Sequence, residues 1–150
     1  MGLFRPEPTT IAEWQALVAE AEVKTGYAFD EHLESYLVLT LDHYTKKDEL
    51  ISSVIALDFL KSTNIARPRD GALLREVGDQ CLILSGLFPE RALKKNVSLT
   101  YFIGMGQQAY LALTDNRLKE SFDPELYNSL SHNFVGLMDL LHSMRSNSEN

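Results

Sequence analysis

A strip of side chains near the middle of the chain combines charge with apolar surroundings. Arg75, Asp79 and Leu82 follow one another at spacings of four and three residues, so they share one side of a predicted helix. Asp79 is the only charged residue in the stretch 77–89, and a carboxylate there is expected to be at least partly buried and to need partners. The pattern favours a structural anchor that fixes helix register, and it leaves open a polar group in a ligand pocket.

Four side chains are candidate partners of Asp79. Arg75 lies one turn earlier on the same predicted helix, and Tyr101, Gln107 and Tyr110 carry hydrogen-bond donors on a second one. In the pocket hypothesis these five residues bind a small, partly apolar ligand. A cavity of ~300 Å³ or more beside them would support that hypothesis. No catalytic residue is predicted.

The histidines and the single cysteine do not form a metal-binding pattern. His32 and His43 stand nearly three helical turns apart, or ~16 Å, so one metal ion cannot bind both. Neither H-x-x-x-H nor E-x-x-H occurs in the chain. Cys81 cannot close an internal disulfide and is expected to act as a small buried hydrophobe. We therefore predict no metal and no cofactor, although spacing leaves open a haem with a single axial histidine.

The charge balance restricts the partners. The chain has 150 residues, with 14 Lys and Arg against 21 Asp and Glu, which gives a formal net charge of −7. An acidic surface disfavours nucleic acid and anionic membranes. The uncharged stretch 96–114 approaches the length of a membrane span, but polar residues such as Asn96 and Gln107 make it unsuitable for hydrocarbon. The chain starts without a signal-peptide pattern, so we expect a cytoplasmic protein.

Hydrophobic periodicity predicts an all-α fold. Apolar residues recur every three or four positions in blocks at 11–25, 31–44, 45–64, 72–88, 89–95, 99–114 and 124–144. A capping box of Thr10 and Glu13 starts the first block, and Asp30, Ser98 and Pro124 start later ones. No period-two alternation typical of strands is visible. The prediction is one domain over 1–150, a bundle of about six or seven helices, with flexible ends at 1–8 and 146–150.

Two faces of these predicted helices are distinctive. The block 72–88 has a seam in which small residues should let a partner helix approach closely: Leu74, Gly78, Cys81, Ser85 and Phe88. The block 124–144 has an uninterrupted apolar seam that could serve the core or a partner helix: Tyr127, Leu130, Phe134, Leu137, Leu141 and Met144. Two polar clusters are expected to have no binding or catalytic role. One is a solvated turn at Arg91, Lys94 and Lys95, and the other is a helix start at Asp30, Glu31 and Glu34.

A longer pattern covers residues 72–113. L-R-x-x-G-D begins at Leu74, L-x-x-x-G-x-F at Leu82, V-x-x-x-Y at Val97 and M-G-x-x-A-Y at Met105. The combination resembles a family of small bacterial all-helical proteins of unknown function, with departures at Phe102, Gly104 and Gln107. The resemblance implies a helical fold and the bacterial cytosol. It implies no reaction and no catalytic residue.

Two functions follow as hypotheses. The favoured one is a non-enzymatic interaction or regulatory module that forms a homodimer or binds a partner protein, because nearly every predicted helix is strongly apolar. The alternative is a protein that binds a small apolar ligand, haem included, or an enzyme, with an interhelical pocket near Asp79.

Overall fold

The computed structural model describes residues 10–46, 71–90 and 98–149, and all its regular elements are helical. They are α1 (Ile11–Thr25), α2 (Glu31–Lys46), α4 (Gly71–Leu87), α6 (Leu99–Ala112), α7 (Pro124–His132) and α8 (Phe134–Glu149), with a 3-10 turn, η1 (Asn116–Leu118). No strand occurs in these ranges, so the all-α prediction is confirmed. The predicted helices at 45–64 and 89–95 and the solvated turn at Arg91, Lys94 and Lys95 lie wholly or largely outside these ranges.

The helix starts follow from local sequence. Thr10 and Glu13 form the capping box of α1, and Gly26 ends that helix in the left-handed conformation with φ 83°. The Asp30 side chain accepts the Leu33 amide, and Ser98 and Asp123 cap α6 and α7 in the same way. The helix starts at Thr10, Asp30, Ser98 and Pro124 were predicted because each depends on neighbours within four residues.

The last predicted helix is in fact two helices. α7 ends at His132 and α8 begins at Phe134. Asn133 separates them: its backbone leaves the helical conformation at φ −98° and ψ 11°, and its side-chain amide donates to the Ser129 carbonyl. The apolar seam continues across this break, and all its members are buried in the core. α8 also extends to Glu149, beyond the predicted end of the block.

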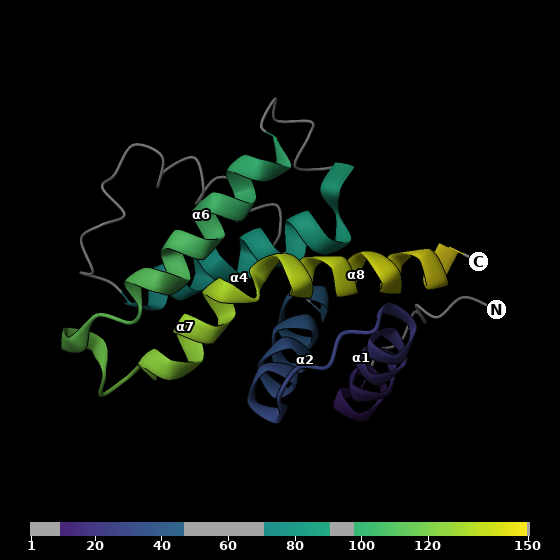
Figure 1. The fold of residues 1–150 in the computed structure, drawn as a ribbon, viewed down its shortest axis with the longest axis horizontal. Coiled ribbons are helices and arrows are strands. Elements are labelled where there is room, and N and C mark those ends of the chain that lie inside the picture. Colours follow the sequence, from purple (N-terminus) through teal and green to yellow (C-terminus); the bar gives the residue numbers. More distant parts are fainter. Residues whose placement is uncertain (1–9, 47–70, 91–97, 150) are drawn as a thin grey trace.

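Helix α4 lies at the centre of the packing. It packs mainly against α6 and α8, α1 packs against α8 and α2, and α6 packs against α7. In Figure 1, α8 crosses the molecule with α1 and α2 on one side and α6 on the other. The buried hydrophobic side chains of these helices form one cluster. None of the described helices is long and apolar enough to cross a membrane.

Small residues bring α4 and α6 together, as the seam predicted. A Cβ on Gly78 would overlap the Tyr110 ring, and a Cβ on Gly106 would overlap the Phe134 ring and crowd Cys81. Helix α2 is buried on some of its sides but not on all of them. Val38 is buried at 2% exposed, but Leu39 is 56% exposed.

Candidate functional site

The carboxyl group of Asp79 joins three helices. Asp79 is 6% exposed, and its Oδ1 accepts hydrogen bonds of 2.7 Å from the hydroxyls of Tyr36 on α2 and Tyr110 on α6. Because Gly78 has no side chain, the Tyr110 ring can lie directly against α4. Hydrogen bonds from two neighbouring helices are what a structural anchor requires.

The second carboxyl oxygen of Asp79 has no such partner. No described residue donates a hydrogen bond to Oδ2, and this oxygen is not among the fully buried atoms that lack a partner. Asp79 therefore keeps one oxygen available for a further donor.

The environment makes this carboxyl hard to ionise. Burial raises the pKa of Asp79 to about 7, and the nearby Glu76 charge raises it too, although both tyrosine hydrogen bonds and the Arg75 charge lower it. The pKa values of Tyr36 and Tyr110 are raised as well, chiefly by burial. A carboxyl that titrates near neutrality can change its charge under physiological conditions.

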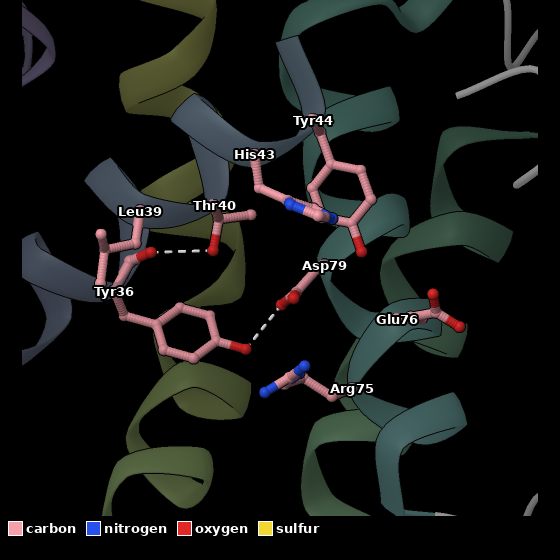
Figure 2. A pocket seen from close by; sticks show the side chains of 8 residues that line it. All are labelled: Tyr36, Leu39, Thr40, His43, Tyr44, Arg75, Glu76 and Asp79. Carbon is pink, nitrogen blue, oxygen red and sulfur yellow. Dashed lines mark hydrogen bonds between the residues drawn. The ribbon is translucent and has the colours of Figure 1, made fainter. Parts of the chain in front are cut away.

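A pocket opens between α2 and α4 with Asp79 in its wall. Its volume is about 260 Å³. Figure 2 shows Asp79 facing the Tyr36 hydroxyl, with the Arg75 side chain on one side and the Tyr44 hydroxyl on the other. The lining combines charged, polar and aromatic side chains: Tyr36, Leu39, Thr40, His43, Tyr44, Arg75, Glu76 and Asp79.

Aromatic rings fix the positions of the hydroxyls around Asp79. The Tyr36 ring meets the Tyr127 ring edge-on with centroids 5.6 Å apart, and the Tyr110 ring edge-on at 6.3 Å. Burial raises the pKa of Tyr127, and the nearby Tyr36 and Arg75 side chains lower it. The hydroxyls that bind Asp79 are therefore held in place inside an aromatic cluster.

The structure brings together three of the five predicted site residues. Arg75 and Asp79 line the pocket, and Tyr110 donates to Asp79 from the protein interior. The Gln107 amide faces α7, where it donates to the Ser131 carbonyl at 3.4 Å. The Tyr101 ring packs beside Phe102 with centroids 5.9 Å apart, and nine residues place Tyr101 ~14 Å along the helix from Tyr110.

The spacing of residues along the chain did not indicate that Tyr36 belongs to the site. It lies 43 residues from Asp79, on a stripe of α2 that the periodicity assigned to the core. Its hydroxyl is the only signal, because a partly buried tyrosine O–H needs a partner. Which partner it meets depends on how α2 packs against α4, and short-range spacing contains no information on that.

The remaining reactive side chains of the described helices have structural surroundings. Cys81 is fully buried, and burial raises the pKa of its thiol. His132 is exposed and contacts the Asn128 carbonyl, whereas His142 contacts the Ser85 carbonyl at 2.8 Å. Within residues 10–46, 71–90 and 98–149 no three His, Cys, Asp or Glu side chains are arranged to hold a metal ion.

A second pocket lies where α2 and α7 begin. Its volume is about 340 Å³, and Asp30, His32, Asp123 and Glu125 contribute to its lining. Asp30 and Asp123 cap the two helices, which accounts for both carboxylates without a ligand.

No protein-family model, curated protein or solved structure matches the chain. The resemblance over residues 72–113 and the cytosolic location that it implies stay predictions.

Proposed function

We propose that this protein binds a small molecule in the pocket between α2 and α4. The observation that supports this proposal is a buried carboxyl, Asp79, whose Oδ2 lacks a described partner in the wall of a 260 Å³ pocket. Oδ2 is not among the fully buried atoms, so a donor in the pocket can reach it. A charged donor from a ligand forms a strong hydrogen bond with a carboxylate oxygen, so binding is favoured at this atom.

The lining fits the partly apolar ligand of the second hypothesis. Leu39 offers an exposed apolar side chain at the pocket, while Tyr36 and Tyr44 offer rings. A few convergent polar groups in a partly apolar wall are the usual composition of a small-molecule site. The proposal is of binding, with any regulatory consequence following from it, and it includes no chemical step.

A small-molecule library screened by ligand-observed NMR tests the proposal. Leu39→Lys introduces a long charged side chain at the pocket, and Val135→Lys introduces the same side chain at an exposed apolar position on α8. Ligands of the pocket should bind the wild type and Val135→Lys, and lose ~10-fold or more in affinity for Leu39→Lys. Hits that bind all three proteins equally, or a screen without hits, would contradict the proposal.

A second candidate function is self-association through α6. This helix contains no charged residue, and Leu111 is 48% exposed on it. A Cβ on Gly104 would meet nothing within 4 Å, so this face is open to an approaching helix. On a chain with net charge −7, an uncharged face is where two copies repel each other least.

Light scattering, which measures the oligomeric state, tests this second candidate. The wild type and Val135→Lys should both show a dimer at micromolar concentration, and Leu111→Lys should shift to the monomer. A monomeric wild type would reject self-association and leave the pocket proposal standing. The seam 127–144 is not available as a partner surface, because its apolar residues are buried within the molecule.

A further inference from the structure

We propose that the ligand of the α2–α4 pocket carries a protonated amine, which donates to Oδ2 of Asp79. This inference rests on the proposed function and specifies its ligand class. It follows from which atoms around Asp79 are already bonded and from the charges in the wall.

The two hydroxyls that donate to Asp79 bind only one of its carboxyl oxygens. The Tyr36 and Tyr110 hydroxyls both donate to Oδ1. The Arg75 side chain lies beside Asp79 and lowers its pKa through its charge. Oδ2 can therefore accept a donor from the pocket, and a charged donor gives the strongest hydrogen bond to a carboxylate.

The walls favour a cation over an anion. Glu76 places a second carboxylate in the lining, against one guanidinium, that of Arg75. The rings of Tyr36 and Tyr44 line the same space, and aromatic faces attract ammonium groups. Leu39 adds apolar surface for the rest of the ligand. The class that fits these groups is a small organic amine with an apolar or aromatic part.

Protonation of Asp79 couples this binding to pH. Burial raises the pKa of Asp79 to about 7, and an ammonium ligand requires the carboxylate form. The amine should therefore bind more tightly as the pH rises through 7, and binding near neutrality should release a proton. The groups that face Asp79 from its neighbours are Tyr36, His43 and Tyr44 on α2, Arg75 and Glu76 on α4, Tyr110 on α6 and Tyr127 on α7. A protonated His43 would also repel an amine, so His43→Asn is compared with the wild type at each pH.

Three probes of one shape test the charge preference. Benzylamine, benzyl alcohol and benzoate present an ammonium, a hydroxyl and a carboxylate on the same ring. Isothermal titration calorimetry and amide chemical shifts of Thr40 and Glu76 report affinity and location. We expect benzylamine to bind the wild type at least ~10-fold more tightly than either analogue, and ~10-fold more tightly at about pH 8 than at about pH 6.

Variants assign the effect to Asp79. Asp79→Asn keeps the shape and removes the charge, and Glu125→Gln removes one negative charge outside the lining of this pocket. Benzylamine affinity should fall ~10-fold in Asp79→Asn and stay unchanged in Glu125→Gln. If Asp79→Asn does not fold, Glu76→Gln takes its place, with an expected loss of about threefold in benzylamine affinity. The pH dependence of benzylamine affinity in the wild type and in His43→Asn then tests the role of the Asp79 charge.

The failures of the two proposals are distinguishable. Benzoate binding at Thr40 and Glu76 more tightly than benzylamine would overturn the amine class and leave small-molecule binding intact. Equal benzylamine affinity in the wild type and Asp79→Asn would also overturn the amine class and leave small-molecule binding intact. If no probe moves those amide signals, the amine class is overturned, and the library screen then determines whether the pocket binds anything.

Discussion

At the scale of single residues, the two tyrosine hydroxyls control the charge of Asp79. Each donates to Oδ1 at 2.7 Å and lowers the pKa of the carboxyl, while burial raises it. Removing either hydroxyl in Tyr36→Phe or Tyr110→Phe should move the titration midpoint of Asp79 upward from about 7, by about one pH unit. Carbon-13 NMR of labelled aspartate side chains measures this midpoint. A midpoint that stays or falls in both variants contradicts the role assigned to the hydroxyls.

The same hydrogen bonds predict how Asp79 contributes to stability. Asp79→Ala leaves the Tyr110 hydroxyl fully buried and the Tyr36 hydroxyl largely so, both without their acceptor. The free energy of unfolding should fall by ~1–3 kcal/mol in urea titrations. Asp79→Asn retains an acceptor oxygen and should lose less. An unchanged melting temperature in Asp79→Ala would mean that the carboxyl does not anchor the helices.

Residue-level patterns predicted the residues of this site on α4 and α6 but not those on α2. A lone charge in an apolar helix must find partners, so Arg75, Asp79 and Tyr110 could be singled out from the sequence. Tyr36 could not, because it lies 43 residues from Asp79 and their contact depends on how α2 packs against α4. The pocket itself has a volume of about 260 Å³, slightly below the ~300 Å³ expected of a ligand site. Of the five predicted site residues, only Arg75 and Asp79 line it.

At the scale of helices, close packing of α6 depends on where its glycines lie. A Cβ on Gly106 would overlap the Phe134 ring and crowd Cys81, whereas a Cβ on Gly104 would meet nothing within 4 Å. Gly106→Ala should therefore destabilise the protein by ~1–3 kcal/mol. Gly104→Ala, two residues away on the same helix, should stabilise it by up to ~1 kcal/mol, since alanine favours helix. Urea unfolding of both variants checks this, and equal effects would refute the packing argument.

Helix boundaries were predictable to different degrees. The starts of α1, α6 and α7 follow from capping side chains at Thr10, Ser98 and Asp123, which act within one turn. The break at Asn133 was missed because the apolar spacing of three and four continues across it. One polar side chain that bonds back to Ser129 was enough to interrupt the helix.

At the scale of the whole molecule, the two described carboxyls with a raised pKa act on stability in the same direction. Burial raises the pKa of Asp79 to about 7, and a hydrogen bond with Glu22 raises that of Glu34 to about 7. Both groups therefore hold a proton in the folded state at pH values where the unfolded chain has released it. Their contribution is complete below the ordinary carboxyl pKa and is lost as the pH rises through 7.

The free energy of unfolding should accordingly fall between about pH 5 and about pH 8, with Asp79 contributing on the order of 2 kcal/mol. Mutual repulsion within a chain of net charge −7 acts in the same sense. Urea titrations at four pH values across this range measure the slope. Asp79→Asn should flatten it, because an amide does not titrate, and Glu34→Gln should flatten it less, since Glu34 is only partly buried. A wild type that becomes more stable toward pH 8, or an Asp79→Asn variant with the wild-type slope, would show that Asp79 is already ionised in the folded protein at pH 5.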